Sequence, residues 1–409
     1  MSKISVIDSI MGSGKTSWAI EYMNENKIDK QFIYVTPFLD EVERVRHALP
    51  HMHEPNEKKG GKLRHFKQLL ASGVDIVTTH ALFSRFDTDI YEMLAQSGYT
   101  LILDEVFNVI EQLNISNSDI KNLIETGTMK IENHKVIWLD NQYDGAFNEL
   151  KDLAEQGNAY SHNGNIIFWT FPASMFQVFE EVYVLTYLFN GQIQRYYYDY
   201  HGVQYDFKAV ERQGNSFVLV DYDKSKENRQ QYADLINIYE GNGGKTDLNV
   251  NYLPELKPLK NQNELSSTWF KFAGEEVIAR LKKNIYTYFR NVAKAKANDI
   301  MWTTIKSKQD ALKGKGYTKG FVSLTMRATN KYSHTHNLAY VYNKYMNPYE
   351  RQFFTSAGVT VDDELLAVSD LIQWIWRSGI RNNPAETINI YIPSKRMRDL
   401  LKQWIKGEI

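Results

Sequence analysis

A loop near the start of the chain combines two glycines, a lysine and a threonine between an apolar strand and a helical stretch. It reads Ser9-Ile10-Met11-Gly12-Ser13-Gly14-Lys15-Thr16. The backbone N–H groups of such a loop can surround phosphates, the lysine adds a positive charge, and the threonine hydroxyl can bind Mg²⁺. The pattern is a Walker A motif in which Ser9 replaces the usual first glycine. It predicts a nucleotide-binding loop formed by Gly12, Ser13, Gly14, Lys15, Thr16 and Ser17.

Two carboxylates follow an apolar run further along the chain. The run Leu101-Ile102-Leu103 ends in Asp104 and Glu105. This is typical of a Walker B motif, in which the aspartate binds Mg²⁺ and the glutamate polarises the attacking water. We therefore expect Thr16 and Asp104 to be metal ligands, and Lys15 and Glu105 to be catalytic. Together the motifs predict Mg²⁺-dependent hydrolysis of ATP or another NTP.

The order of further motifs resembles that of superfamily 2 helicases, in particular the DEAD-like helicases of bacteriophages, from residue 3 to about 401. Tyr34-Val35-Thr36-Pro37 resembles motif Ia, and Asp75–Phe83 resembles the segment that follows it. The resemblance implies contacts with the phosphates of a bound strand, because short hydroxyl side chains can donate hydrogen bonds to phosphate oxygens. Each segment alone could equally be a strand-to-helix cap. The implied nucleic-acid contacts are Thr36, Pro37, Thr78, Thr79 and His80.

Other segments match the later helicase motifs. Val184–Phe189 resembles motif III, with Trp169–Ala173 as a rival placement, and both could be plain core strands. Met301–Thr304 resembles motif IV. Thr325–Asn330 resembles motif V, which implies that Arg327, Thr329 and Asn330 contact nucleic acid.

The run Gln373–Arg381 resembles motif VI with two departures. Trp376 replaces a glycine, and the second arginine lies one residue later than in the motif. The resemblance implies that Gln373 contacts the nucleotide, and that Arg377 or Arg381 neutralises charge on the γ-phosphoryl group as an arginine finger. The alternative is a basic helix end that complements the helix dipole.

The charge of the chain is unevenly distributed. Lys plus Arg number 48 and Asp plus Glu number 49, a net charge of −1, which excludes a wholly basic nucleic-acid binder. Residues 271–331, however, hold fourteen Lys and Arg against four acids, a net charge of +10, so the remainder carries −11. Glycines alternate with Lys313, Lys315 and Lys319, and this suits phosphate contacts. A solvated helix face explains the lysines equally well.

Apolar strands alternate with helical patterns, which predicts an α/β fold with two RecA-like lobes, parallel sheets and β-rich insertions. The expected parts are a lobe 1 core (1–115), the rest of lobe 1 with the insertions (116–240), a linker (241–263) and lobe 2 (264–409). We expect an aromatic strand-turn-strand over Gln192–Ala209, and a strand at Phe321–Leu324 in lobe 2.

These features predict an NTP-dependent helicase or translocase that acts on single-stranded or duplex DNA, or on RNA. Replication or recombination proteins are possible partners, a role that rests on resemblance. No apolar run is long enough for a membrane span, so we expect a cytoplasmic protein. The alternatives are a terminase-like DNA-packaging ATPase, which needs a nuclease lobe with separated acids, and a nucleotide-gated regulatory protein with little turnover. Cysteine is absent, which excludes an iron–sulfur cluster.

Overall fold

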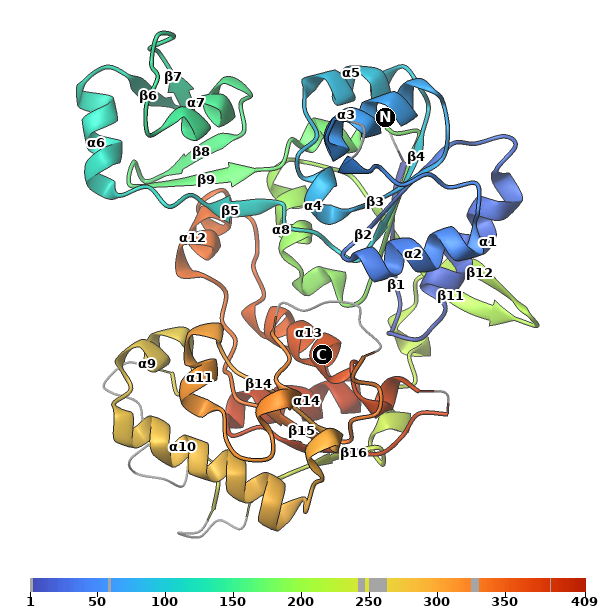
Figure 1. Ribbon diagram of the computed structural model, residues 1–409, viewed down its shortest axis with the longest axis vertical. Coiled ribbons are helices and arrows are strands. Elements are labelled where there is room, and N and C mark those ends of the chain that lie inside the picture. The colour runs from blue at the N-terminus through green and yellow to red at the C-terminus, as the bar shows by residue number, and fades with distance from the viewer. Residues whose placement is uncertain (1–2, 58–59, 242–246, 250–262, 325–330, 383) are drawn as a thin grey trace. The chain divides into compact units, whose positions relative to one another are not determined.

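The computed structural model describes residues 3–57, 60–241, 247–249, 263–324, 331–382 and 384–409 (Figure 1). The chain forms two compact units. The first is built mainly from residues up to 222, together with the later segment 347–361. The second is built mainly from residues 223–346 and 362–409.

The first unit is organised around a seven-stranded sheet, which is parallel except for the edge strand β12 (Ser216–Asp221). Its strands, in spatial order, are β12 (Ser216–Asp221), β11 (Asp206–Gln213), β1 (Lys3–Asp8), β10 (Glu181–Thr186), β4 (Thr100–Asp104), β2 (Phe32–Thr36) and β3 (Ile76–Thr79). The register places Asp104 opposite Leu185, and Asp8 opposite Thr186. The carboxyl ends of six parallel strands therefore lie at one edge of the sheet.

Helices bury the apolar faces of this sheet. Trp18 and Met23 of α1 and Val42 of α2 pack with Tyr34 and Ile102 of the sheet in one buried hydrophobic cluster. Both helices place apolar residues at the spacing of one helix face. The helices of this part are α1 (Lys15–Asn26), α2 (Leu39–Ala48), α3 (Lys62–Ala71), α4 (His80–Phe83), α5 (Thr88–Ala95) and α8 (Ile193–Tyr200).

A β-rich insertion follows β4, as the sequence predicts. Its five strands form an antiparallel sheet, and two helices enclose a separate core around Ile120, Trp138 and Ile167. In spatial order the strands are β5 (Ile110–Gln112), β9 (Ile166–Thr170), β8 (Ala159–His162), β7 (Lys135–Trp138) and β6 (Met129–Glu132), and the helices are α6 (Asn117–Glu125) and α7 (Asn148–Glu155).

The expected strand-turn-strand over Gln192–Ala209 is wrong in its first half, which forms helix α8. Tyrosines favour strands by intrinsic propensity, but here Gln194, Tyr197 and Tyr198 are buried at the i, i+3, i+4 spacing of a helix. The Gln194 side-chain amide donates to the Tyr198 hydroxyl at 2.9 Å. Tertiary packing of one helical face therefore decides this segment.

The later segment 347–361 joins the first unit through α12 (Pro348–Ser356). The buried Phe353 ring lies 4.7 Å from Tyr200 of α8 and 5.2 Å from Phe168 of β9. The Arg195 guanidinium donates to the Thr360 carbonyl at 2.7 Å. Figure 1 shows α12 beside β5 and α8. The segment thus packs against both the β-rich insertion and α8.

The second unit contains a four-stranded parallel sheet. In spatial order its strands are β13 (Ile236–Ile238), β16 (Ile388–Tyr391), β15 (Asn337–Tyr340) and β14 (Ile300–Thr303), and its helices are α9 (Ser267–Phe272), α10 (Glu275–Thr287), α11 (Gln309–Leu312), α13 (Asp363–Ile375) and α14 (Lys395–Lys406). The predicted strand at Phe321–Leu324 is wrong. Phe321 makes one isolated bridge to Trp302, and β15 takes the place between β14 and β16.

A histidine between two carboxylates joins the amino ends of three of these strands. His336 Nδ1 lies 2.7 Å from Asp299 Oδ1, and its Nε2 contacts Glu386. Asn337 donates to the other Asp299 oxygen at 2.7 Å. Burial alone would lower the pKa of His336, but the hydrogen bonds with Glu386 and Asp299 outweigh burial and raise it. The protonated imidazole is therefore favoured in the folded protein.

Phe353→Ala should destabilise the first unit by about 3–5 kcal/mol, because it removes a buried ring from a packed aromatic cluster. Urea unfolding of the full-length protein measures this loss. Tyr349→Ala is the matched control on the same helix, since that ring is 47% exposed. Equal losses in the two variants would contradict the assigned packing of α12.

The His336 network should make stability depend on pH. Because the folded pKa is raised, its contribution is fully present below the unfolded pKa of about 6.5 and is lost as the pH rises through the folded value. Urea midpoints of the wild type should fall as the pH rises from about 6 to about 9, while His336→Asn should start lower and vary less over this range. The exposed His334→Asn is the control. Parallel profiles for wild type and His336→Asn would refute the network.

Candidate functional site

The predicted phosphate loop, residues 9–16, follows β1 and runs into the start of α1. Gly12 and Gly14 have φ values of 83° and 99°, which an L side chain rarely adopts. A Cβ atom on Gly14 would lie 2.1 Å from the Phe217 ring of β12. Lys15 is buried and donates to the Ser9 carbonyl. The Ser13 hydroxyl is buried, with no hydrogen-bond partner among the described residues.

The geometry of Ser9 explains why the first glycine of the motif is dispensable here. Ser9 does not adopt a positive φ. Its N–H donates to the Thr186 carbonyl at 3.1 Å, and its hydroxyl accepts a hydrogen bond from the Val210 N–H at 3.0 Å. The serine thus joins the ends of β1 and β10 to β11. A glycine could not make the hydrogen bond with Val210.

The predicted metal ligand Asp104 ends β4 and is buried. Burial raises its pKa, and the positive charge of Lys15 offsets part of this shift. Thr36 Oγ1 lies 3.5 Å from Asp104 Oδ2, and His80 Nε2 lies 3.1 Å from the Asp104 carbonyl oxygen. A buried carboxylate close to a lysine and a threonine hydroxyl supplies the hard oxygen donors that Mg²⁺ prefers. The described residues contain no cluster of three His, Cys, Asp or Glu side chains that could hold a metal alone.

The predicted base Glu105 follows directly, with a φ of 70°. A left-handed backbone is uncommon for a non-glycine residue and is often found at functional sites. The Glu105 N–H donates to the Leu185 carbonyl at 2.8 Å, which fixes this conformation against β10. Thr16 and Ser17 open helix α1, with Thr16 half-buried and Ser17 exposed.

Asp8 is a further site residue that the sequence patterns missed. Its two carboxylate oxygens accept hydrogen bonds from the N–H groups of Leu188 and Phe189, at 2.8 and 2.9 Å. Asp8 thereby fixes the turn after β10, in which Leu188 has a φ of 56°. The run Val184–Phe189 therefore adjoins both Walker strands, whereas its rival Trp169–Ala173 lies at the end of β9 in the insertion.

The predicted nucleic-acid contacts of the first unit divide into two groups. The side chains of Thr36 and Thr78 are buried, so their hydroxyls do not face solvent. Pro37, Thr79 and His80 are partly exposed. His80 lies 3.1 Å from the Asp104 carbonyl oxygen, so the end of β3 contacts the end of β4.

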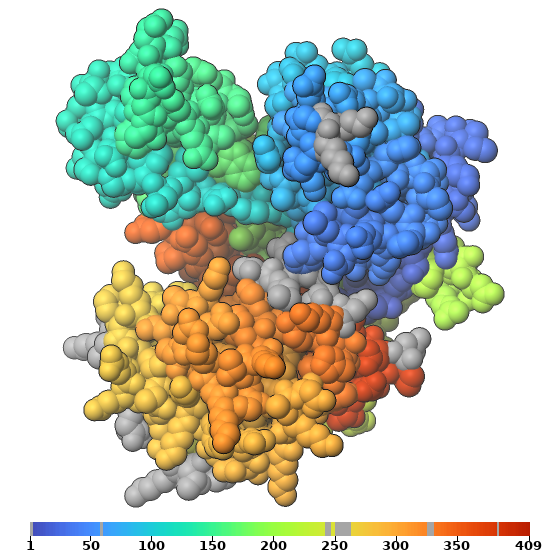
Figure 2. Space-filling view, in the orientation of Figure 1, coloured from blue at the N-terminus to red at the C-terminus, as the bar shows by residue number. Residues whose placement is uncertain are grey.

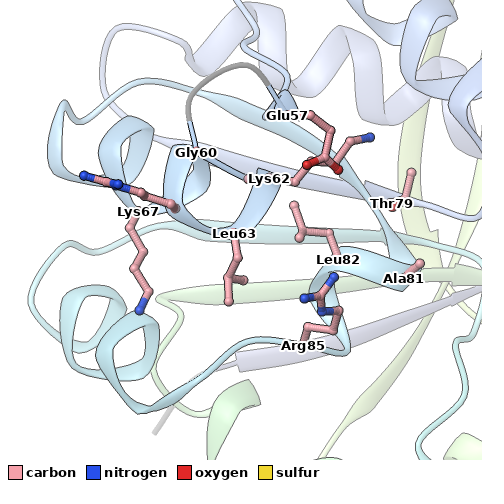
Figure 3. Close-up of a pocket in the computed structure, with 11 residues that line it drawn as sticks. Glu57, Gly60, Lys62, Leu63, Lys67, Thr79, Ala81, Leu82 and Arg85 are labelled. Carbon is pink, nitrogen blue, oxygen red and sulfur yellow. The ribbon is translucent and has the colours of Figure 1, made fainter.

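A pocket of about 590 Å³ lies beside Thr79 (Figure 3). Lys62 and Leu63 of α3 form one wall, and Thr79, Ala81 and Arg85 form the other. Four of its lining residues are cationic and one is acidic: Lys62, Arg64, Lys67, Arg85 and Glu57. Lys67 is paired with Asp87 and Asp89, at 2.7 and 2.6 Å. The pocket is thus electropositive and suited to an anion.

The second unit holds the predicted motif VI at the end of α13. Arg377 is buried and donates to the Ser323 carbonyl at 3.2 Å, whereas Arg381 is partly exposed. Gln373 Nε2 is buried and has no hydrogen-bond partner in the described part of the chain. Trp376, which replaces the glycine of the motif, packs 4.8 Å from Tyr232 and 5.5 Å from Trp404. The tryptophan therefore fills the core of this unit.

The basic segment is described only in part. Residues from about 265 to 320, yellow to orange in Figure 2, cover much of the visible face of the second unit. Lys313 pairs with Asp310 at 2.8 Å, while Lys315 and Lys319 are exposed. The predicted contacts Arg327, Thr329 and Asn330 lie outside the described residues. Of the predicted linker, the described residues 247–249 are buried, and Asn284 of α10 donates to the Leu248 carbonyl at 3.1 Å.

A phosphate loop at the carboxyl edge of one parallel sheet, followed by a second parallel-sheet unit, defines a two-lobed helicase-like fold. The solved structure titled XPD_Helicase is similar to this chain, with a TM-score of 0.51 and 12% identity over 99% of this chain and 94% of that one. The structure of S. tokodaii Xpd4 matches with a TM-score of 0.48 and 10% identity over 98% and 94%. At this identity the XPD likeness establishes the fold.

The family is established by sequence. Residues 230–405 match the YonV C-terminal Rossmann-like domain, and residues 110–169 match the YonV middle domain, which is the β-rich insertion. The SPbeta prophage-derived protein YonV of Bacillus subtilis (strain 168) is 41% identical over 426 residues and covers all of both chains. The chain therefore belongs to the YonV family. Within the described residues, every helix is too short or too polar to cross a membrane.

Proposed function

We propose that this protein is an NTP-dependent superfamily 2 helicase or translocase that acts on DNA or RNA. The observation that carries the proposal is that Lys15 and Thr16 follow β1 and the buried Asp104 ends β4, at the same edge of one parallel sheet with only β10 between the two strands. The XPD-like fold supports it. The prophage relative is consistent with a role in phage replication or recombination.

In this proposal the N–H groups of Gly12–Ser17 and the Lys15 ammonium bind the NTP phosphates, and Thr16 and Asp104 hold Mg²⁺. The ion, when bound, neutralises charge on the β- and γ-phosphates. Glu105 positions the attacking water and accepts its proton. Arg381 or Arg377 supplies positive charge to the γ-phosphoryl group. Arg381 fits this role better, because it is partly exposed whereas Arg377 is buried.

A link between hydrolysis and strand binding follows from two contacts of Asp104. Thr36 and His80, at the ends of β2 and β3, both lie within hydrogen-bonding distance of this residue. Thr79, next to His80, lines the electropositive pocket. If metal binding moves Asp104, His80 would therefore transmit the movement to Thr79 in the pocket wall. We propose that this pocket binds a phosphate of the tracked strand.

The NTPase activity is tested with Lys15→Ala and Glu105→Gln. Wild-type protein should hydrolyse NTP faster when single-stranded DNA is added. Lys15→Ala should lose nucleotide binding, whereas Glu105→Gln should still bind nucleotide but turn it over about 10²–10⁴-fold more slowly. Lys27→Ala, an exposed lysine just beyond α1, is the control. The hydrolase proposal fails if the wild type shows no turnover with any NTP or nucleic acid.

Strand binding by the first unit is tested with Lys62→Gln and Arg85→Gln. Each should weaken single-stranded DNA binding and reduce the slope of log affinity against log salt by about 0.7, because each substitution removes one cation that would neutralise a phosphate. Salt titrations of fluorescence anisotropy measure both quantities. Lys121→Gln, exposed on α6 of the insertion, should leave the slope unchanged. An unchanged slope in both pocket variants would remove this pocket from the strand path.

A further inference from the structure

A second pocket is lined only by residues of the second unit, at the amino-terminal ends of two strands of its sheet. Its volume is about 650 Å³. Ile300, which begins β14, and Thr335, two residues before β15, both line it. The amino ends of these two parallel strands therefore border this pocket. It shares no lining residue with the pocket beside Thr79 and includes none of residues 9–16.

The lining of this pocket has an apolar floor and a cationic rim. Ile300, Gly320 and Thr335 are buried and form the floor. Lys319 and Lys331 are exposed at the rim, and no carboxylate is among the lining residues that the structure describes. Bare phosphate would gain nothing from the floor, and a neutral apolar molecule would gain nothing from the lysines. The lining therefore suits an amphipathic anion.

Aromatic side chains narrow the class of ligand. Tyr332 and His334 both line the pocket, and the Lys331 ammonium lies 6.0 Å from the centre of the Tyr332 ring. An aromatic wall favours a planar ring, because stacking buries both faces at little conformational cost. A planar ring joined to a negative charge describes a nucleotide. The volume falls in the range of small-molecule sites, about 300–1,000 Å³.

The walls of the pocket are held in place by buried contacts. Tyr317 anchors the glycine- and lysine-rich loop from beneath, since its hydroxyl donates to the Leu312 carbonyl at 2.6 Å and its carbonyl accepts from the Trp302 indole at 2.8 Å. A Cβ atom on Gly320 would lie 2.2 Å from the Ile300 carbonyl oxygen, so only glycine allows this close approach. On the opposite wall, the N–H and hydroxyl of Thr335 both donate to the Tyr332 carbonyl, at 2.9 and 2.7 Å.

We propose that this pocket binds a nucleotide, with the base on the Ile300 floor beside Tyr332 and the phosphate between Lys319 and Lys331. The ligand is either a base turned out of a bound single strand or a free nucleotide, since both present the same ring and charge. The proposal also predicts different roles for the lysines of the basic segment, because Lys319 lines the pocket while Lys313 and Lys315 do not. It does not depend on NTP hydrolysis.

The test uses 2-aminopurine, whose fluorescence is quenched by stacking. Full-length Lys15→Ala protein is the parent, so the phosphate loop does not contribute, and the result is independent of NTPase activity. One arm uses single-stranded DNA with one internal 2-aminopurine, and the other uses the free 2-aminopurine deoxynucleoside monophosphate. We expect saturable quenching in at least one arm. Quenching of the oligonucleotide alone assigns the site to a strand, and quenching of the monophosphate assigns it to a free nucleotide.

Substitutions in the pocket, made in the Lys15→Ala protein, test whether the quenched complex forms there. Tyr332→Ala should weaken the quenched complex about tenfold or more. Ala297→Trp should block the pocket from an exposed position while retaining Tyr332 and both lysines. Lys319→Gln should weaken binding, and Lys315→Gln, a matched exposed lysine on the same loop, should not. No quenching in either arm, quenching that persists in both Tyr332→Ala and Ala297→Trp, or equal effects of the two lysine substitutions would overturn the proposal.

Discussion

Burial of the Asp104 carboxylate at the end of β4 constrains everything around the phosphate loop. Removing a carboxylate from water is costly unless charges and hydrogen bonds compensate for it, and the raised pKa of Asp104 reflects that cost. The compensating groups come from other elements: the Tyr34 and Thr36 hydroxyls from β2, and the positive charges of Arg44 from α2 and Lys15 from α1. Because these groups lie on different elements near the carboxyl edge of one parallel sheet, the burial of a single carboxylate depends on how those elements are arranged.

The sheet register makes this arrangement rigid. Asp104 lies opposite Leu185, whose carbonyl accepts from the N–H of Glu105, and Asp8 fixes the turn that follows β10. The hydrogen bond from the Glu105 N–H to β10 thus helps to hold the positive φ of this residue. A conformation that is costly for an isolated residue persists because its neighbours determine it. Such preorganisation is what a site that orients a water molecule requires.

The parts of the site that could be predicted from sequence are those in which local backbone chemistry is decisive. Gly12, Gly14 and Lys15 identify the phosphate loop because few other residues allow that turn, and an apolar run ending in Asp104 identifies its partner strand. Asp8 could not be found this way, since its role depends on backbone N–H groups 180 residues later. Helix α8 and the packing of α12 were missed for the same reason: tertiary burial of Tyr197 and Phe353 decides these segments, and no local pattern records it. The departures at Ser9 and Trp376 become intelligible only from their contacts with Val210, Tyr232 and Trp404.

Charge counted along the sequence is likewise a poor guide to where an anion binds. The segment 271–331 carries +10, yet Lys313 within it is paired with Asp310, just as Lys67 of the first unit is paired with two aspartates. Exposed ion pairs of this kind contribute little to stability, but they reduce the charge available to a ligand. In the proposed nucleotide pocket the relevant cations are instead Lys319 and Lys331, which line one concave surface together. Shape therefore selects from an unevenly charged chain the few side chains able to recognise a phosphate.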